Sequence, residues 1–524
     1  MKIIKTISLN IQVLFFFFFV VLQLGVSKTA LSSQKRVQHK KGREISAAAV
    51  KEREVVTHHK VVIDGHAIYY TAAAGTIILK DKKMKPTASI FYIAYFKDGV
   101  KNKDQRPITF AYNGGPGSSS VWLQFGGIGP RRLVLPNAEF EPPPPYQLEN
   151  NQYSILNKTD LVFIDPVGTG YSHALGKNSP KKFWGVEQDV TSMGVFIQDF
   201  LTKFNRWNSP KFILGESYGT TRSAALSYYL QEQGIPLNGV ILCSSILNWE
   251  TAVFYPGNDL PYILYLPSYA AVAWYHHKLN PMPKNLPKFL NRVERFATGE
   301  YAEALMDGNT VPRAFERKIL KKLARYTAIK ASFWKQADLR VNNSEFEKEL
   351  LHKQGFELGR LDARFTGYAR RPFLPFRTYS VMGEAISGAF TTAANMYIKN
   401  NLKYNSKRPY DVMSSRAIRE WSWKHRIPNQ IFGHTGGFLN VAPDLAVAMT
   451  RNPHLQLMQN NGYFDLGTPF YATLYTLNHL LLPKPLMSHI HIYNYYSGHM
   501  IYLNSQALKL LHHNIDHFIS SAAR

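Results

Sequence analysis

The sequence predicts an α/β protein with a mainly parallel central sheet and a largely helical insertion. Short apolar runs that end at glycine or proline alternate with stretches of helical spacing, which is typical of parallel strands covered by helices on both faces. The alternation stops between residues 249 and 440, where helix formers, aromatic residues and basic residues prevail, and it returns from residue 441 onward. We therefore expect a core in two parts, residues 55–248 and 441–524, interrupted by a helical cap.

The N-terminal residues precede this core. Lys2 and Lys5 come before a nearly continuous apolar run at residues 11–24, and small residues follow it. This pattern is typical of a secretory signal peptide, which we predict over residues 1–27; the alternative is an uncleaved membrane anchor. The basic residues 28–54 are predicted to be disordered. We expect a soluble exported protein, secreted or periplasmic, with no stable membrane insertion after signal cleavage.

Composition narrows the class of protein further. The formal net charge is +26, but the basic residues do not alternate with aromatic residues as in a nucleic-acid module, so no nucleic-acid partner is expected. Cys243 is the one cysteine, so no internal disulfide can form, which favours a bacterial exported protein. The histidine pairs, such as His512-His513, have no evident carboxylate partners, so we expect neither a metal site nor a cofactor.

The first part of the core begins with strands and then alternates strand and helix. Residues 55–96 alternate in the manner of antiparallel strands, with a hairpin turn at Asp64-Gly65. The expected elements that follow are a strand at 108–112, a glycine-rich loop at 113–117, a strand at 161–165 and a helix at 184–204. The strands at 108–112 and 161–165 are short and mainly apolar, which indicates burial on both faces.

The most informative stretch follows these elements. Residues 212–214 form a short apolar run, and it ends in Gly215-Glu216-Ser217-Tyr218-Gly219, a G-x-S-x-G sequence. Helical spacing resumes directly after it, and a further strand is expected at 240–243. A serine at a strand-to-helix turn is the context of a nucleophile elbow, in which a strained backbone exposes the hydroxyl group.

The second part of the core supplies a base and an acid for that serine. Strands are expected at 455–459 and 489–496, and helices at 468–482 and 502–519. Asp465 follows the first of these strands and His499 follows the second. The order Ser217, Asp465, His499 is the order of an α/β-hydrolase triad. His499 would take the Ser217 proton and return it to the leaving group, and Asp465 would orient the imidazole.

Two further groups belong to the predicted site. Gly114 and Gly115 follow a strand within Asn113-Gly-Gly-Pro-Gly117, where their backbone N–H groups can face a bound anion or oxyanion. Glu216 precedes the nucleophile, where a negative charge develops during reaction. A carboxyl group at that position makes chemical sense if it is protonated and donates a hydrogen bond.

Five segments resemble one known family. FAYNGGPGSSSVWLQFGGIGP, IDPVGTGYS, LGESYGT, NGYFDLGTP and SGHMIY occur in this order and are similar to motifs of the serine carboxypeptidases, carboxypeptidase Y-like enzymes and especially their bacterial branch. The resemblance covers most of residues 55–520. It implies an α/β-hydrolase fold and the removal of C-terminal amino acids from peptides, best at acidic pH.

The resemblance also assigns roles to individual residues. The family's nucleophile, acid and base correspond to Ser217, Asp465 and His499, its oxyanion hole to the N–H groups of Gly115 and Tyr218, and its recognition of the substrate carboxylate to Asn113, Gly114 and Glu216. A carboxyl group and a substrate carboxylate can share a hydrogen bond only if one of them is protonated, so low pH would favour peptide binding.

The sequence departs from the family pattern at three positions. Ala111 replaces a tryptophan, Ser118 replaces a cysteine, and Gly127 replaces the second carboxylate-binding glutamate. Arg131 or Arg132 could supply charge for a substrate carboxylate instead, or both could be ordinary surface arginines. An esterase or acyltransferase on the same triad, or a binding-only relative, are the alternative functions. The oligomeric state is left open.

Overall fold

The central element is a ten-stranded sheet. The computed structural model describes residues 51–369, 379–428 and 437–523. The strand order is β1-β2-β3-β7-β4-β9-β10-β13-β14, and β8 pairs with β3. The strands are β1 (Glu54–Ile63), β2 (His66–Lys80), β3 (Pro86–Lys97), β4 (Ile108–Tyr112), β7 (Asp160–Ile164), β8 (His173–Ala174), β9 (Lys211–Glu216), β10 (Gly239–Cys243), β13 (Gln456–Gly462) and β14 (Ile490–Tyr495). From β7 to β14 all neighbours are parallel, whereas β1, β2 and β3 are antiparallel.

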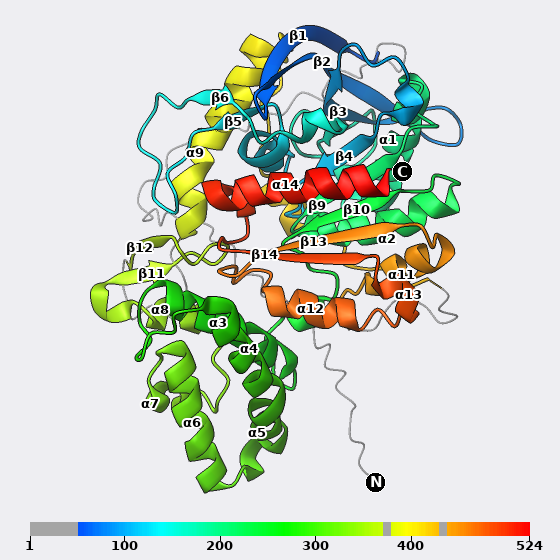
Figure 1. Cartoon of the computed structure of the whole chain (residues 1–524). Coiled ribbons are helices and arrows are strands. Elements are labelled where there is room, and N and C mark those ends of the chain that lie inside the picture. Colours follow the sequence, from blue (N-terminus) through cyan, green and yellow to red (C-terminus); the bar gives the residue numbers. More distant parts are fainter. Residues whose placement is uncertain (1–50, 370–378, 429–436, 524) are drawn as a thin grey trace, which may run out of the picture.

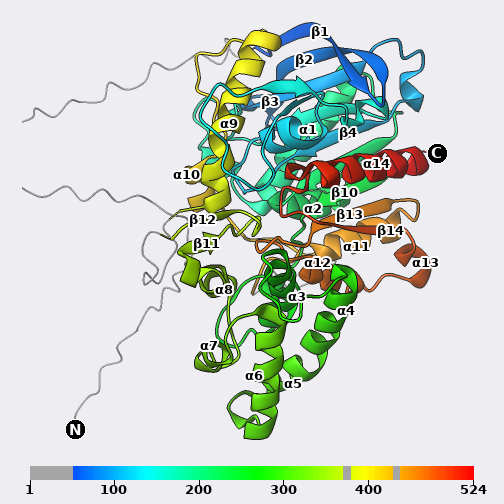
Figure 2. The ribbon, with the colours of Figure 1, turned by 60° about the vertical axis from the view of Figure 1, so that its left-hand side comes forward.

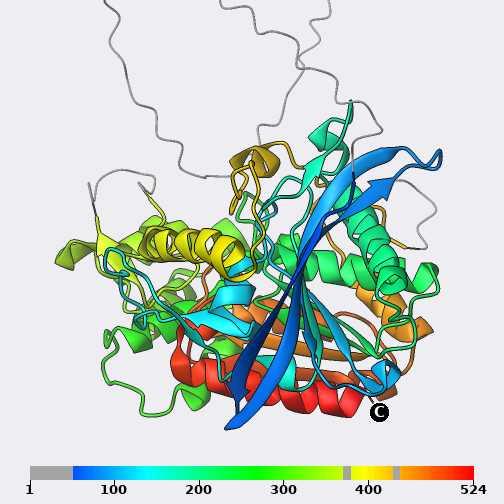
Figure 3. The ribbon, with the colours of Figure 1, turned by 90° about the horizontal axis from the view of Figure 1, so that it is seen from above.

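The N-terminal strands form the predicted hairpin. β1 and β2 pair in register from Glu54 opposite Gly75 to Ile63 opposite His66, so the turn lies at Asp64-Gly65. Seen from above, this long blue hairpin runs across the top of the sheet (Figure 3). The strand predicted at 108–112 coincides with β4. β13 extends three residues beyond the strand predicted at 455–459, to Gly462.

Side chains of the parallel strands alternate between two cores. In β9, Phe212 and Leu214 belong to one core and Ile213 to the other, as the two-residue period of a strand requires. One face is covered by α1 (Val186–Lys203), α2 (Tyr218–Glu232) and α11 (Ala442–Arg451). The opposite face is covered by α14 (Ser505–Ala522), drawn in red in Figure 1. Both faces are therefore closed to water, which explains the continuous apolar runs.

The insertion is largely helical and has a core of its own. Its helices are α3 (Leu260–Tyr275), α4 (Leu286–Phe296), α5 (Ala302–Asp307), α6 (Arg313–Thr327), α7 (Ala331–Gln336), α8 (Asn343–Glu349), α9 (Val381–Met396) and α10 (Ser415–Arg419). Figures 1 and 2 show α3 to α7 gathered below the sheet, beyond β14. Their core includes Phe464 and Leu466, so these helices support the loop that carries Asp465.

Two features of the insertion differ from the sequence prediction. No strand was expected there, but β11 (Phe356–Leu358) and β12 (Thr366–Tyr368) form a small antiparallel ribbon. α9 does not join the lower helices; it packs with Trp122 and Phe125 on the other side of the molecule. Three-residue strands and the choice of packing partner leave no periodic signal in the sequence, which is why both were missed.

Other short elements complete the core. They are β5 (Arg131–Leu133), β6 (Leu148–Asn150), α12 (Phe470–Asn478) and α13 (Lys484–Met487). The predicted helix at 468–482 is thus shorter, and the final helix begins at Ser505 rather than Tyr502, because Ile501–Leu503 forms a separate 3₁₀ turn. Within the described ranges, no helix is both long enough and apolar enough to cross a bilayer. The predicted segments 1–27 and most of 28–54 lie outside the described residues.

A buried ion pair joins α1 to α2 beneath the site. The Arg222 guanidinium donates to Asp189 Oδ2 at 2.7 Å and to the backbone oxygen of Asn113 at 2.8 Å. Both charged side chains are almost completely buried. Burial disfavours the charged guanidinium, but the charge of Asp189 outweighs it and raises the pKa of Arg222. Arg222 therefore fixes the loop at Asn113 as well as the two helices.

Replacing Arg222 by methionine is expected to lower the free energy of unfolding by about 3–5 kcal/mol, because it leaves a buried carboxylate without its partner. Urea denaturation followed by tryptophan fluorescence measures this. Arg451→Met is the matched control, since its ion pair with Glu232 is more than 40% exposed at both side chains and is expected to be worth less than about 1 kcal/mol. Equal effects of the two substitutions would contradict the prediction.

Candidate active site

The strand-to-helix turn at Ser217 has the geometry that its sequence predicts. β9 ends at Glu216 and α2 begins at Tyr218, so Ser217 is the single residue between them. Its backbone has φ 60° and ψ −131°, a conformation that costs a non-glycine residue about 1–3 kcal/mol. The Ser217 N–H donates to the oxygen of Cys243 at 3.0 Å, which holds the turn against β10. Glu216 and Tyr218 are buried, whereas Ser217 is partly exposed.

Asp465 and His499 form a buried hydrogen-bonded pair at the same edge of the sheet. His499 Nδ1 lies 2.7 Å from Asp465 Oδ2. Thr468 Oγ1 donates to the same oxygen at 2.7 Å, and the N–H groups of Gly467 and Thr468 donate to Asp465 Oδ1 at 2.7 and 3.0 Å. Ser244 Oγ donates to the backbone oxygen of His499 at 2.7 Å. Four donors therefore fix the Asp465 carboxylate. It contacts the imidazole of His499 at Nδ1 and not at Nε2.

The electrostatics of His499 follow from this pairing. Burial alone would lower the pKa of the imidazole, but the charge and hydrogen bond of Asp465, together with the charge of Glu216, outweigh burial and raise the pKa. With Nδ1–H donated to Asp465, the lone pair of the neutral ring lies on Nε2. The ring can therefore accept a proton at Nε2 and is stabilised once it carries the charge.

The glycine-rich loop lies directly against the turn. A Cβ atom on Gly114 would be 2.4 Å from the nitrogen of Tyr218 and 2.7 Å from the oxygen of Glu216, so only glycine fits there. Asn113 is buried and holds the loop in place: its Oδ1 accepts from the N–H of Leu123 at 3.0 Å. Tyr218 is the first residue of α2, so its N–H has no intrahelical acceptor. This loop and the first N–H of α2 thus meet beside Ser217.

Glu216 is a buried carboxyl group with one oxygen in use. Its Oε1 accepts from Asn113 Nδ2 at 2.8 Å and from the Tyr502 hydroxyl at 3.2 Å. Its Oε2 is buried and has no hydrogen-bond partner in the part of the chain that the structure describes. Burial raises the pKa of Glu216 to about 7, against the opposing effects of His499, Tyr502 and Asn113. The group can therefore be neutral below neutral pH.

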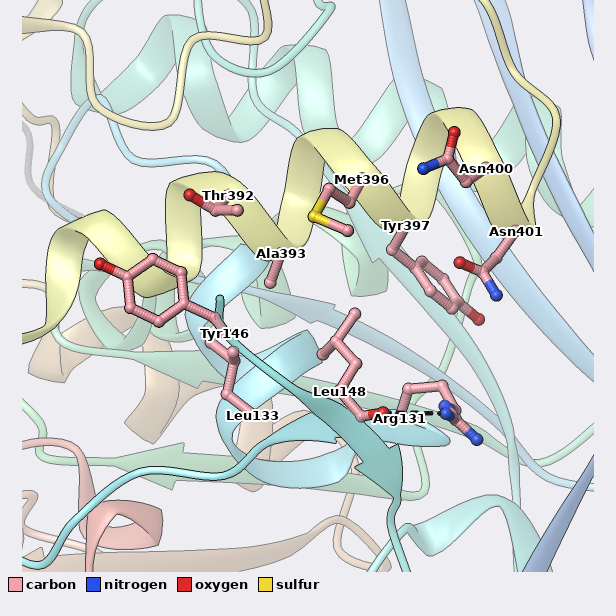
Figure 4. Close-up of a pocket in the computed structure, with 10 residues that line it drawn as sticks. All are labelled: Arg131, Leu133, Tyr146, Leu148, Thr392, Ala393, Met396, Tyr397, Asn400 and Asn401. Atoms are coloured by element: carbon pink, nitrogen blue, oxygen red, sulfur yellow. Dashed lines mark hydrogen bonds between the residues drawn. The ribbon is translucent and has the colours of Figure 1, made fainter. Parts of the chain in front are cut away.

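Arg131 and Arg132 lie on β5, where both interact with β6. Arg131 Nη2 donates to the backbone oxygen of Leu148 at 2.9 Å, and Arg132 forms an ion pair with Glu149. Arg131 also lines a cavity of about 220 Å³ between this ribbon and α9, shown in Figure 4. Apart from Arg131, none of the residues that line this cavity was predicted to contact the substrate. The two arginines are engaged by β6 instead, which favours a structural role over carboxylate binding.

One of the histidine pairs has carboxylate neighbours that the sequence did not suggest. His512 Nε2 lies 3.5 Å from an oxygen of Asp64 and 3.6 Å from an oxygen of Asp516. The expectation that His512 has no carboxylate partner is therefore wrong. The pairing brings the turn between β1 and β2 next to α14.

Sequence reasoning missed Thr468 and Tyr502. Each lies three residues beyond a predicted site residue, Asp465 or His499, and each contacts a carboxyl group of the site. Thr468 lies within the segment NGYFDLGTP and Tyr502 within SGHMIY. Position within a motif was the available signal, but the side-chain direction depends on how distant loops meet.

The sheet order, the turn at Ser217 and the pair Asp465–His499 define an α/β-hydrolase fold. Residues 75–253 match the family model described as serine carboxypeptidase. The chain is similar to serine carboxypeptidase-like 45 of Arabidopsis thaliana, with 28% identity over 187 residues, 34% of this chain and 37% of that protein. It is also similar to the vitellogenic carboxypeptidase of Aedes aegypti, with 30% identity over 147 residues, 28% of each chain.

The likeness extends further in structure than in sequence. A solved structure of Kex1(delta)p, a prohormone-processing carboxypeptidase from Saccharomyces cerevisiae, covers 86% of this chain and 91% of its own, with a TM-score of 0.53 and 16% identity. At 16% identity, this similarity supports the fold alone. The matches to the curated relatives span 28–44% of those relatives' own length.

Proposed function

We propose that this protein is a serine carboxypeptidase that hydrolyses C-terminal peptide bonds through an acyl-enzyme. The observation that carries the proposal is the Asp465–His499 hydrogen bond of 2.7 Å at the sheet edge where Ser217 occupies a strained turn. The match of residues 75–253 to the serine carboxypeptidases supports the choice of substrate class.

In the proposed mechanism, His499 Nε2 takes the Ser217 proton as the hydroxyl oxygen attacks the peptide carbonyl. The N–H groups of Gly115 and Tyr218 stabilise the resulting oxyanion. His499 then gives the proton to the leaving amino acid, and the ester formed on Ser217 is hydrolysed by water in the same two steps. Asp465 holds the imidazole and stabilises its charged form throughout. No metal or cofactor takes part.

Covalent labelling tests the nucleophile directly. A fluorophosphonate probe is expected to label the wild-type protein and not the Ser217→Ala variant, because the probe reacts with an activated serine hydroxyl. Circular dichroism of the variant serves as the control for folding. An unlabelled wild type, or a Ser217→Ala variant labelled to the same extent, would rule out the catalytic proposal, and the first of these results would favour a binding-only relative.

An esterase or acyltransferase on the same triad is the second candidate, and Gly127 is the observation that favours it. The acid that the family places at this position is absent, so half of the predicted carboxylate-binding pair is missing. Blocked dipeptides, their C-terminal amides and simple esters, compared between pH 4 and 8, separate the two functions. Turnover of esters alone would exclude the peptidase.

Glu216 gives the proposed peptidase a distinct pH dependence. A protonated Glu216 can donate to a substrate carboxylate, whereas the ionised form repels it. With a pKa of about 7, this contact is present at acidic pH and is lost as the pH rises through that value. The ratio of kcat/KM for a blocked dipeptide to that for its amide is expected to fall toward tenfold per pH unit above about pH 8.

Taking the ratio removes the titration of His499, which both substrates share. Glu216→Gln is the matched variant, because glutamine is neutral and can donate at every pH; its ratio is expected to be independent of pH. A wild-type ratio that stays constant from pH 5 to 9 would be inconsistent with recognition of the carboxylate by Glu216.

We also propose that the protein is exported, secreted or periplasmic. The proposal rests on Lys2, Lys5 and the apolar run at 11–24. N-terminal sequencing of the mature protein from its native host tests it: a mature terminus near residue 28 is expected, and an intact N-terminus would argue for the membrane anchor.

A further inference from the structure

Tyr502 contacts the acid of the candidate site from the loop that carries His499. Its hydroxyl donates to Glu216 Oε1 at 3.2 Å, and the two residues are 286 positions apart in sequence. Tyr502 is 4% exposed and Glu216 is 2% exposed. Burial raises the pKa of this phenol well above its ordinary value, so the hydroxyl remains a donor throughout the working pH range.

The ring of Tyr502 fills the space that glycines leave in the segment Leu123–Ile128. A Cβ atom on Gly126 would lie 2.4 Å from Tyr502 Cε2, and a Cβ atom on Gly127 would lie 3.0 Å from Tyr502 Cδ1. Neither glycine has a positive φ. The lack of space for a side chain, rather than the backbone conformation, therefore explains why glycine occupies both positions. The Tyr502 ring therefore occupies the space that a side chain at position 127 would need.

In this arrangement, one carboxyl oxygen of Glu216 accepts hydrogen bonds and the other accepts none. Asn113 Nδ2 and the Tyr502 hydroxyl both donate to Oε1, at 2.8 and 3.2 Å. Oε2 is buried and has no hydrogen-bond partner among the described residues. A buried carboxyl oxygen without a partner is costly, so a ligand group that hydrogen-bonds to it would be bound favourably.

We propose that Tyr502 is a specificity-determining positioning residue that stands in for the missing acid at position 127. By holding Oε1 of Glu216, it directs Oε2 toward the terminal carboxylate of a peptide. The inference deepens the proposed function and rests on it. The Tyr502 hydroxyl is a donor that does not ionise. With it in place, Glu216 alone, rather than a pair of acids, would recognise the substrate carboxylate.

The groups around Glu216 are consistent with this role. His499 lowers the pKa of Glu216, and Asp465 raises it. The thiol of Cys243 lies on β10, opposite Glu216 in register, and is buried and neutral. The Tyr502 and Asn113 hydrogen bonds also lower the pKa of Glu216, so removing the Tyr502 hydroxyl should shift the titration of Glu216 upward.

Binding of a blocked dipeptide to the Ser217→Ala protein tests the inference without turnover. Tyr502→Phe in that background is expected to weaken binding of the dipeptide acid about tenfold. The ratio of the affinity for the acid to that for the dipeptide amide should fall by the same factor. The pH at which binding of the acid is lost should rise. Isothermal titration calorimetry from pH 5 to 8 measures all three. A variant with unchanged discrimination and an unchanged pH midpoint would overturn the inference.

Two further variants separate positioning from general stability. Tyr301→Phe removes a buried hydroxyl that donates to the oxygen of Leu339 at 2.7 Å in the insertion, and it is expected to keep the discrimination of the parent. Gly127→Glu combined with Tyr502→Ala replaces the phenol by an acid in the vacated space and is expected to restore discrimination that Tyr502→Ala alone loses. No restoration would show that positions 127 and 502 are not interchangeable and would refute the stand-in role.

These measurements keep the two proposals apart. Loss of fluorophosphonate labelling in the wild type would refute the peptidase, whereas equal binding of acid and amide to the parent protein would refute carboxylate recognition by the Tyr502–Glu216 pair. The first result leaves the binding measurement fully interpretable, because it is made on a protein that lacks the nucleophile.

Discussion

Replacing Asp465 by asparagine is expected to lower kcat by about 10⁴-fold. The local hydrogen bonds decide how the new amide must lie. Two backbone N–H groups, from Gly467 and Thr468, donate to Oδ1, so the amide oxygen has to occupy that position. The NH₂ group then faces His499 Nδ1 and donates to it, which moves the imidazole proton to Nε2. A protonated Nε2 cannot accept the Ser217 proton.

Steady-state kinetics on an activated ester and on a blocked dipeptide measure the effect. Thr468→Val is the matched control: it removes the hydroxyl donor to Asp465 Oδ2 but leaves the carboxylate and the tautomer, so a loss of about tenfold is expected. An Asp465→Asn variant that retains more than a tenth of the wild-type kcat would be incompatible with the proposed role of the pair.

The positions of the three candidate triad residues could be predicted because they depend on chain order. β9 and β13 are buried, β14 is the partly exposed edge strand, and neighbouring strands from β9 through β10 and β13 to β14 run parallel. Ser217, Asp465 and His499 each follow one of the strands that the sequence predicts, and the carboxyl ends of parallel strands share one edge of the sheet, so the sequence alone brings them to that edge. The strain at Ser217 follows from the same pattern.

What escaped prediction depends on contacts between distant segments. Tyr502 was assigned to the last helix, but it lies in a separate turn and reaches a carboxyl group on β9. Gly127 could be identified only as a position that lacks an acid; the ring that occupies its space comes from the other end of the chain. No periodicity encodes such a pairing. α9 illustrates the same limit, since its apolar face could pack on either of two cores.

Gly114→Ala is expected to lower kcat by about 10²–10³-fold, the typical effect of losing an oxyanion-hole donor. The new Cβ would meet backbone atoms: the nitrogens of Tyr218 and Gly219 at 2.4 and 2.6 Å, and the oxygen of Glu216 at 2.7 Å. None of these can turn aside as a flexible side chain would. The loop must therefore move away from the turn, which separates the Gly115 N–H from the Tyr218 N–H across the proposed oxyanion site.

The size of the kinetic effect distinguishes loss of preorganisation from simple destabilisation. Overpacking of this kind costs about 1–3 kcal/mol of stability, which the folded enzyme can absorb at 25 °C, so a fall in kcat measured below the unfolding transition reports on the site. Gly388→Ala is the matched control, because Gly388 lies inside helix α9 and a Cβ there would meet only the ring tip of Tyr146, with its hydroxyl oxygen at 3.2 Å. If both variants keep kcat within threefold of wild type, the Asn113–Gly115 loop does not contribute to the oxyanion hole. A fall confined to Gly114→Ala, with an unchanged KM for the ester, is the result that transition-state stabilisation by this loop requires.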